Sequence, residues 1–200
     1  MINIDGEDID LLKKDWGVLI ILDACRYDIF SEVYRPILKK KGVLKKAITH
    51  CSGTKEWMVG NIYNKDCGDI IYVDPIVMFD NFVPKHNFFK VEMVWKKYWD
   101  YDYGTINPKD MTDVAIELIK KNPEKRFIIH YHQPHPPYLL TEYLGLEDVI
   151  TPEKIIKAVN ENINPHNTFS HFFQGNLKRF LGHERAWKIL INLNMKIMYY

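Results

Sequence analysis

The sequence predicts an α/β fold built on a mostly parallel sheet. Short apolar runs alternate along the chain with longer segments of helical character, and this alternation is typical of strands joined by crossover helices. The first clear run, residues 18–22, contains five apolar residues without a polar break, follows Gly17 and ends at Asp23. A short run of this kind indicates a strand buried on both faces, at the centre of such a sheet.

Composition sets the broad class of the protein. Two hundred residues, 46% hydrophobic and 26% charged, suit a single domain over 1–200 with a sizeable core. The formal net charge of +1 leaves no basic excess to neutralise phosphates, which argues against a nucleic-acid partner. No apolar run is long enough to span a bilayer, and the start is acidic where a signal peptide would be basic. Three cysteines without zinc-site spacing indicate free thiols and a cytoplasmic protein.

Local signals predict the other elements. Residues 5–14 indicate a short amphipathic helix, and residues 27–41 a second helix that Pro36 kinks and Gly42 ends. Pro108 in the first turn and lysines in the last predict a helix over 108–121. The remaining expected strands are 43–49, 69–73, 88–95 and 126–132, and the remaining expected helices are 55–63, one from about 151, and one over 186–200.

Asp23 stands where the first strand ends, at the edge of the sheet where open α/β proteins bind their ligands. A carboxylate there is costly unless it is paired, and a metal ion is a usual partner. The alternative is that Asp23 caps the helix that follows, which is the more frequent role for an isolated aspartate at such a junction. The other candidate residues shift the balance towards a metal ligand.

A turn of small residues at 52–54, Ser-Gly-Thr, leads directly into the helix expected over 55–63. Backbone amides of a first helical turn together with a hydroxyl make an anion site, and Lys55 adds a positive charge beside it. The Thr54 hydroxyl could attack a phosphorus or sulfur centre if a metal lowered its pKa. Alternatively, Ser52 or Thr54 is simply the N-cap of the helix.

Three histidines gather at the end of the 126–132 strand and in the loop after it: His130, His132 and His135. On a strand His130 and His132 share one face, and His135 can turn into the same crevice. Ordinary hydrogen-bonded histidines are one alternative. A second is a zinc hydrolase site made of all three, similar to the metallo-β-lactamase motif, although Pro134 replaces the aspartate of that motif.

Arg26 and Asp28 follow Asp23 closely in the chain. Arg26 could clamp an anionic ester, or it could form a structural ion pair with Asp28. The ion pair is the favoured interpretation of this spacing. Arg26 remains a candidate substrate-binding residue, as are Lys55 and His132.

In this order the motifs resemble those of the alkaline phosphatase superfamily, specifically its sulfatase-like and lipoteichoic-acid-synthase-like branch. The likeness runs from about residue 16 to 138 and is carried by residues 22–28 (Leu-Asp-Ala-Cys-Arg-Tyr-Asp), 52–57 (Ser-Gly-Thr-Lys-Glu-Trp) and 134–138 (Pro-His-Pro-Pro-Tyr). The resemblance implies a three-layer α/β sandwich with a mostly parallel sheet. It also implies a metal-dependent hydrolase or transferase that acts on phosphate or sulfate esters.

The resemblance assigns roles to three residues. Asp23 would ligate a divalent metal. Oxygen and histidine ligands are compatible with zinc, manganese or calcium. Thr54 would be both nucleophile and metal ligand, and His135 would bind the ester oxygens or assist the leaving group. The substrate would be a phosphate or sulfate ester of a small molecule, a lipid or a sugar.

One departure from the family stands out. The family completes its metal site with an Asp-His pair after a late strand, and this sequence contains no Asp-His dipeptide. We therefore expect a fold that is incomplete at the C-terminus and exposes an apolar sheet edge, with a second copy or a complementing chain as partner. The alternative function is a catalytically inactive or incomplete sulfatase-like domain that acts as a subunit or an anion-binding module.

Overall fold

The computed structural model describes residues 2–4, 7–38, 43–49, 51, 53–135 and 151–161. The chain divides into two compact units, Met1–Glu142 and Tyr143–Tyr200, so the expectation of one domain over the whole chain stays a prediction. Other predictions concern residues outside the described part: Gly42, Ser52, 136–138 and the helix over 186–200.

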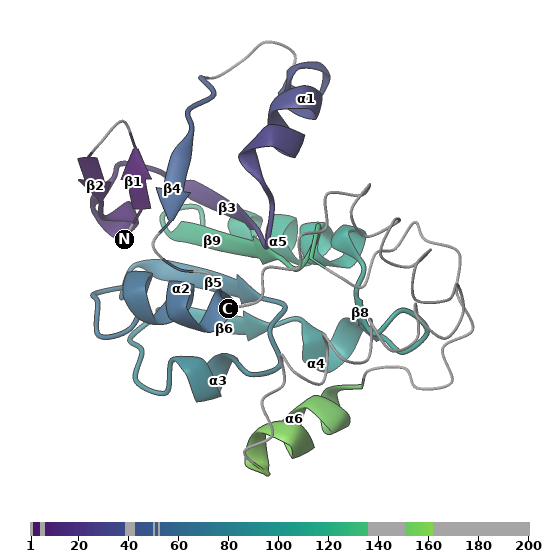
Figure 1. Ribbon diagram of the computed structural model, residues 1–200. Coiled ribbons are helices and arrows are strands. Elements are labelled where there is room, and N and C mark those ends of the chain that lie inside the picture. Colours follow the sequence, from purple (N-terminus) through teal and green to yellow (C-terminus); the bar gives the residue numbers. More distant parts are fainter. Residues whose placement is uncertain are drawn as a thin grey trace, which may run out of the picture. The chain divides into compact units, whose positions relative to one another are not determined.

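A four-stranded, all-parallel sheet in the order β3-β9-β5-β6 organises the first unit (Figure 1). Its strands are β3 (Val18–Leu22), β5 (Ile70–Asp74), β6 (Lys90–Met93) and β9 (Arg126–Tyr131). The α/β class expected from the alternation of apolar runs is confirmed. Because β9 is inserted between β3 and β5, the last strand of the sheet lies beside the first, with Ile21 opposite His130.

Helices and one small hairpin precede or connect these strands. The connecting elements of the first unit are η1 (Leu11–Lys13), α1 (Tyr27–Leu38), α2 (Thr54–Asn61), α3 (Phe79–Phe82), α4 (Trp95–Tyr98), α5 (Pro108–Lys121) and the hairpin β7 (Trp99–Asp100) with β8 (Thr105–Ile106). The second unit contains α6 (Pro152–Asn160). No helix in the described part of the chain is long and apolar enough to cross a membrane.

α5 begins and ends where the sequence predicts, because its ends carry strong local signals. The side chain of Asn107 accepts a hydrogen bond from the amide of Lys109 at 2.9 Å and caps the helix, and Pro108 occupies the first turn. The lysines Lys120 and Lys121 lie in the last turn, where the helix dipole favours positive charge.

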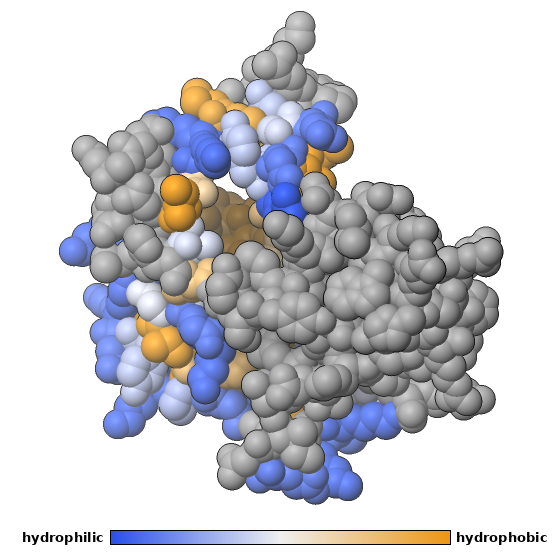
Figure 2. Space-filling view, viewed as in Figure 1, coloured by the Kyte–Doolittle hydropathy of each residue, from blue (hydrophilic) through white to orange (hydrophobic). Residues whose placement is uncertain are grey.

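β3 is not central, and the prediction of a strand buried on both faces is wrong. Among the described residues it pairs with β9 alone. Val18, Ile20 and Leu22 are 44%, 57% and 37% exposed, and α5 covers the corresponding face over β9 and β5. Figure 2 shows hydrophobic side chains around a hollow below α1. Five consecutive apolar residues indicate a strand but do not say how many of its faces will be covered.

The prediction of an amphipathic helix over 5–14 is also wrong. β1 (Ile2–Ile4), β2 (Glu7–Ile9) and β4 (Ala47–Thr49) form a separate antiparallel sheet in the order β2-β1-β4. The strand expected over 43–49 therefore exists but joins this sheet instead of the parallel one. Residues 7–9 pair with β1, which in turn pairs with β4, and the local apolar pattern over 5–14 does not specify these partners.

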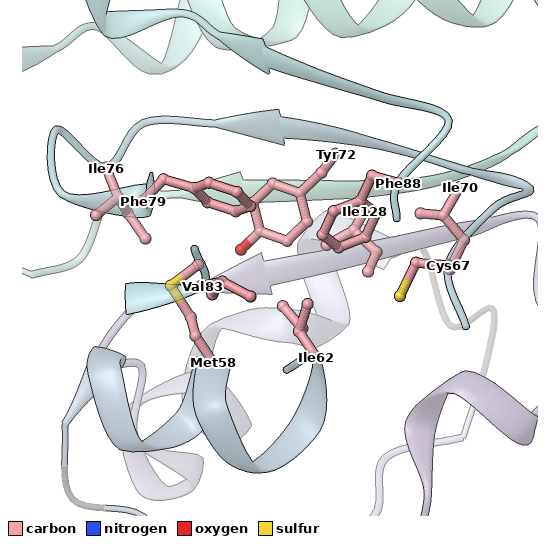
Figure 3. Close-up of a cluster of buried hydrophobic side chains, with 10 residues drawn as sticks. All are labelled: Met58, Ile62, Cys67, Ile70, Tyr72, Ile76, Phe79, Val83, Phe88 and Ile128. Carbon is pink, nitrogen blue, oxygen red and sulfur yellow. The ribbon is translucent and has the colours of Figure 1, made fainter. Parts of the chain in front are cut away.

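Two apolar clusters cover the faces of the parallel sheet. On one face α2 and α3 pack against β5 and β9, and Figure 3 shows the Tyr72 ring close to Phe79 and Phe88 within this cluster. The ring centroids of these two pairs lie 5.1 and 5.2 Å apart. On the other face α5 and the β7–β8 hairpin pack against β5 and β9. The first cluster consists of Met58, Ile62, Cys67, Ile70, Tyr72, Ile76, Phe79, Val83, Phe88 and Ile128.

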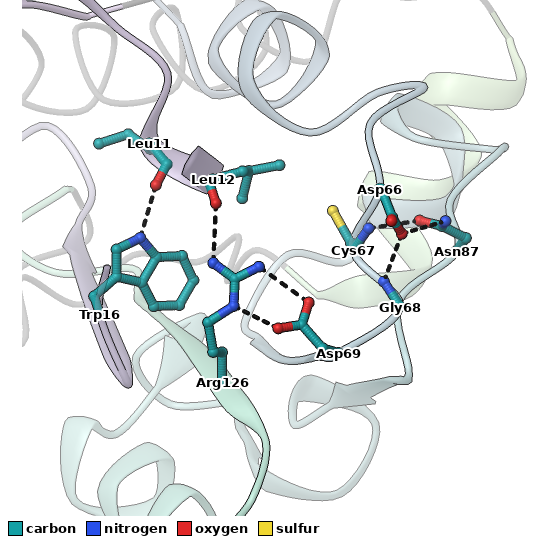
Figure 4. A network of polar contacts seen from close by, with 9 residues as sticks. All are labelled: Leu11, Leu12, Trp16, Asp66, Cys67, Gly68, Asp69, Asn87 and Arg126. Atoms are coloured by element: carbon teal, nitrogen blue, oxygen red, sulfur yellow. Dashed lines mark hydrogen bonds and ion pairs between the residues drawn. The ribbon is translucent and has the colours of Figure 1, made fainter. Parts of the chain in front are cut away.

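Arg126 ties the segment before β3 to the start of the sheet (Figure 4). Its guanidinium donates Nε to Asp69 Oδ2 at 2.6 Å and Nη2 to Asp69 Oδ1 at 3.0 Å, a bidentate pair. It also donates Nη1 to the carbonyl of Leu12 at 2.9 Å and lies over the Trp16 ring, 4.6 Å from its centroid. One side chain thus connects η1, β5 and β9.

We expect Asp69→Asn to lower the free energy of unfolding by about 1 kcal/mol at pH 7, a value near the upper end for partly exposed ion pairs. Hydrogen bonding by Arg126 holds the pKa of Asp69 below its ordinary value. The stabilisation is therefore complete above the pKa of an unfolded aspartate and disappears as the pH falls through the lower pKa of the folded state. Urea unfolding at pH 7 and at pH 2.5 measures both.

Glu117→Gln, which removes an ion pair with Lys121 on the surface of α5, is the matched control and should change the stability less. An Asp69→Asn variant that is as stable as wild type at pH 7 would contradict the role assigned to this pair.

Candidate functional site

Asp23 lies directly beyond β3 and continues its pairing with β9. Its amide donates to the carbonyl of Tyr131 at 3.0 Å, and its side chain shares a face with Ile21 because side chains alternate along a strand. This is the face that packs against α2. The carboxylate is 15% exposed, so it lies at the margin of the apolar cluster.

A tight turn separates Asp23 from α1. Ala24 adopts a φ of 58°, in the left-handed region that costs an alanine roughly 1–2 kcal/mol. The amide of Cys25 donates back to the carbonyl of Leu22 at 3.2 Å. Strained backbone of this kind persists where the surrounding structure needs it, and it is concentrated at functional sites.

Thr54 is the first residue of α2 and contacts Asp23. Its Oγ1 donates a hydrogen bond to Asp23 Oδ2 at 2.9 Å. The Asp23 carboxylate therefore turns to α2. α1 begins at Tyr27, four residues after Asp23, so Asp23 is not the residue that caps this helix. The sequence predicted that these two side chains share a crevice, and the structure brings them together.

Within the described residues, which exclude position 52, the start of α2 has no side-chain cap. Its N-cap residue is Gly53, in extended conformation with φ −136° and ψ 162° and no side chain to accept from the first-turn amides. Thr54 is thus not an N-cap, because its hydroxyl bonds Asp23 instead of the helix backbone. Uncapped amides and the positive end of the helix dipole favour an anion at this position.

His130 forms a group of three polar side chains together with Asp23 and Thr54. It is 1% exposed, and its Nε2 lies 3.7 Å from Asp23 Oδ2, beyond a direct hydrogen bond but close enough for charge attraction. The Trp57 ring of α2 meets its imidazole edge-to-face, with centroids 6.0 Å apart. Sequence reasoning placed His130 only in the three-histidine alternative. The parallel register of β3 and β9 brings it beside Asp23, and nothing local in the sequence states that register.

The electrostatic surroundings of Asp23 keep it ionised. Burial alone would raise the pKa of its carboxyl group, but electrostatic interactions with His130, His135 and His132 outweigh burial and hold this pKa far below its ordinary value. The carboxylate is therefore charged throughout the neutral range. A charged acceptor strengthens the hydrogen bond from Thr54.

The loop after β9 carries the other two histidines. The amide of His135 donates to the carbonyl of His132 at 3.0 Å, and their rings meet edge-to-face with centroids 5.0 Å apart. Gln133 anchors the loop to β8 by donating Nε2 to the carbonyl of Ile106 at 3.1 Å. Both rings are half-buried and act electrostatically on Asp23, and their place in a shared crevice stays a prediction.

Two predicted substrate-binding residues lie at the surface. Arg26 donates Nε to Asp28 Oδ1 at 3.0 Å, so the ion-pair interpretation of this spacing is confirmed and the clamp on an ester stays a prediction. Lys55 is exposed in the first turn of α2, directly after Thr54. Its position beside the helix N-terminus is the one expected from the sequence.

The donors that converge here suit a divalent metal. Asp23 offers a carboxylate oxygen and Thr54 a hydroxyl oxygen within 2.9 Å of each other, and hard cations and zinc both accept oxygen ligands. Among the described residues, no three histidine, cysteine, aspartate or glutamate side chains are grouped closely enough to hold a metal ion. Asp23 and Thr54 thus fit part of a metal site.

Comparisons with known proteins add no relative to this picture: no protein-family model, no curated protein and no solved structure matches the chain.

We expect Thr54→Val to lower the free energy of unfolding by about 2 kcal/mol at pH 7, because a buried carboxylate loses its hydrogen-bond donor. Thr54→Ser keeps a hydroxyl at the same position and should remain within about 0.5 kcal/mol of wild type. Urea unfolding of the three proteins measures the difference. Equal stability of the valine and serine variants would show that the hydrogen bond between Thr54 and Asp23 contributes nothing.

Proposed function

We propose that the protein is a metal-dependent hydrolase or transferase of phosphate or sulfate esters, with Thr54 as the nucleophile. The observation that carries the proposal is the 2.9 Å hydrogen bond from Thr54 Oγ1 to Asp23 Oδ2 at the uncapped N-terminus of α2. A hydroxyl, an ionised carboxylate and an anion-binding helix end are the parts that nucleophilic attack on an anionic ester requires.

Different residues bind the ester, orient the nucleophile and hold the metal. The first-turn amides of α2 and the exposed Lys55 attract the anionic group of the ester and hold it against Thr54. Asp23 accepts the hydrogen bond from Thr54 and so fixes the direction of Oγ1. A divalent cation held by Asp23 and Thr54 would lower the pKa of the hydroxyl and offset the charge of the ester.

The reaction proceeds by displacement at phosphorus or sulfur. Thr54 Oγ1 releases its proton to solvent water and forms a bond to the central atom while the bond to the alcohol oxygen breaks. The departing alkoxide takes up a proton, for which His135 is the candidate donor, with His132 beside it. Water, or an acceptor alcohol in a transferase, then releases the phosphoryl or sulfuryl group from Thr54.

The remaining expectations follow from the same proposal. The substrate is a phosphate or sulfate ester of a small molecule, a lipid or a sugar. A second copy or a complementing chain stays the expected protein partner, and the exposed apolar residues of β3 are compatible with it. The three free thiols, Cys25, Cys51 and Cys67, suit a cytoplasmic protein.

Activity of the Thr54 variants tests the nucleophile. We expect metal-dependent hydrolysis of a generic aryl phosphate or aryl sulfate by wild type, and a loss of about a thousandfold or more in kcat for Thr54→Ala. Thr54→Ser retains an attacking hydroxyl and should keep measurable turnover. Activity of Thr54→Ala equal to that of wild type would exclude Thr54 as nucleophile. No turnover by wild type with any of zinc, manganese or calcium would favour the non-catalytic alternative.

Metal binding tests Asp23 separately from turnover. Calorimetric titration with zinc, manganese or calcium should give at least about a hundredfold weaker binding to Asp23→Asn, since loss of a ligand exceeds the roughly 10–100-fold effect of an outer partner. Asp28→Asn is the matched control, because it removes a nearby carboxylate that is paired with Arg26. Equal affinities of wild type and Asp23→Asn would refute the metal role of Asp23.

A further inference from the structure

Tyr72 contacts the site from its far side, through His130. The phenol oxygen of Tyr72 lies 2.7 Å from His130 Nδ1, and both side chains are buried, at 0% and 1% exposed. β5 and β9 are neighbours with Tyr72 opposite Ile128, so Tyr72 and His130 stand on the same face of the sheet. Sequence reasoning did not select Tyr72, because only the strand order brings it to His130.

Polar groups of three adjacent strands therefore form a line across the sheet towards α2. Tyr72 of β5 meets Nδ1 of His130, Nε2 of His130 faces Asp23 beyond β3, and Asp23 accepts from Thr54. The line crosses an apolar cluster in which the Tyr72 ring packs against Phe79 and Phe88 (Figure 3). Buried polar groups are costly unless each has a partner, so the position of every proton along this line matters.

The hydrogen-bond partners decide where the proton of His130 lies. Burial raises the pKa of Tyr72 well above its ordinary value, so the phenol keeps its proton at neutral pH. Within the described residues, Nδ1 of His130 is the hydrogen-bond acceptor within reach of this phenol. If Nδ1 carried a proton, the phenol would hold a buried donor without an acceptor. Donation from Tyr72 to Nδ1 avoids that cost and leaves the imidazole proton on Nε2.

The other ring nitrogen agrees with this assignment. Nε2 faces the carboxylate of Asp23 at 3.7 Å, and an N–H directed at a carboxylate is favourable whereas a nitrogen lone pair is not. Both ends of the imidazole thus select the same tautomer. A nitrogen that carries a proton has no lone pair for a metal, so this arrangement also argues against the three-histidine zinc site.

We propose that Tyr72 is a positioning residue that holds His130 in the Nε2–H tautomer, so that His130 directs a positively polarised N–H at the Asp23–Thr54 pair and does not act as a metal ligand. The tautomer is a property of the folded chain. Its consequence for turnover rests on the proposed function. Without the phenol, both tautomers become accessible, and the orientation of Asp23 towards Thr54 loosens.

Nitrogen-15 NMR of the histidine side chains in the full-length protein tests the tautomer directly. His130→Gln assigns the resonances by their disappearance. In wild type we expect the Nδ1 signal of His130 at the position of an unprotonated, hydrogen-bonded nitrogen and the Nε2 signal at that of a protonated one. In Tyr72→Phe, which keeps the ring, we expect both signals to move towards averaged values. Protonated Nδ1 in wild type, or an unchanged tautomer in Tyr72→Phe, would overturn the proposal.

Tyr131→Phe is the matched control. It removes a phenol from the opposite face of β9, where the hydroxyl bonds Thr112 at 2.8 Å, and it should leave the His130 signals unchanged. With an aryl ester substrate, we expect Tyr72→Phe to lower kcat about tenfold, the size of a modest transition-state effect, with KM within about twofold. A loss of kcat as large in Tyr131→Phe would show that the effect is structural and overturn the positioning role.

The two proposals fail in different ways. The expected tautomer in a wild-type protein without any turnover refutes the proposed function and supports the role of Tyr72 in orienting His130. Thr54-dependent turnover with a proton on Nδ1 supports the proposed function and overturns the tautomer. If Tyr72→Phe does not fold, the wild-type spectrum alone decides the position of the proton.

Discussion

Backbone pairing of β9 with both β3 and β5 is the constraint on which the rest of the first unit depends. β9 lies between β3 and β5. β3 precedes it in the chain by more than a hundred residues, and β5 by about half as many. Through this pairing the turn after β3 and the end of β9 meet at one edge of the sheet, and the buried Tyr72 of β5 reaches His130 of β9. Arg126, at the start of β9, secures the opposite end through Asp69 and Leu12.

The candidate site lies in unusually apolar surroundings for polar side chains. Its line of polar side chains crosses the apolar cluster under α2 and α3, where aromatic rings pack on Tyr72. Such a line stabilises a fold only when its buried polar groups are paired. Here Tyr72 bonds His130, Thr54 bonds Asp23, and Nε2 of His130 faces the Asp23 carboxylate at 3.7 Å. An apolar core would be simpler to build. A charged Asp23 and strain at Ala24 are better explained by a use for the carboxylate than by stability.

Much of the secondary structure could be predicted because its signals are local. Asn107, Pro108 and the terminal lysines define α5, and the apolar runs define β3, β5 and β9. The failures have a common cause. An apolar run is compatible with one or two covered faces, as β3 shows. The short apolar pattern over 5–14 does not reveal that residues 7–9 pair with another strand. In the site, the pairing of Asp23 with Thr54 could be inferred, whereas His130 and Tyr72 depend on strand order.

From its sequence alone this protein is an α/β chain whose motifs suggest an ester-processing site around Asp23, Thr54 and His135. Those features come from residue type and spacing, which determine local conformation and the chemistry a side chain can perform. Tertiary structure decided that β3 lies at the edge of the described sheet, that β4 belongs to a different sheet, and that Tyr72 reaches His130. The physical reason is that hydrogen bonds between strands far apart in the chain determine which side chains meet. The residues next to a given position in the sequence do not specify these hydrogen bonds.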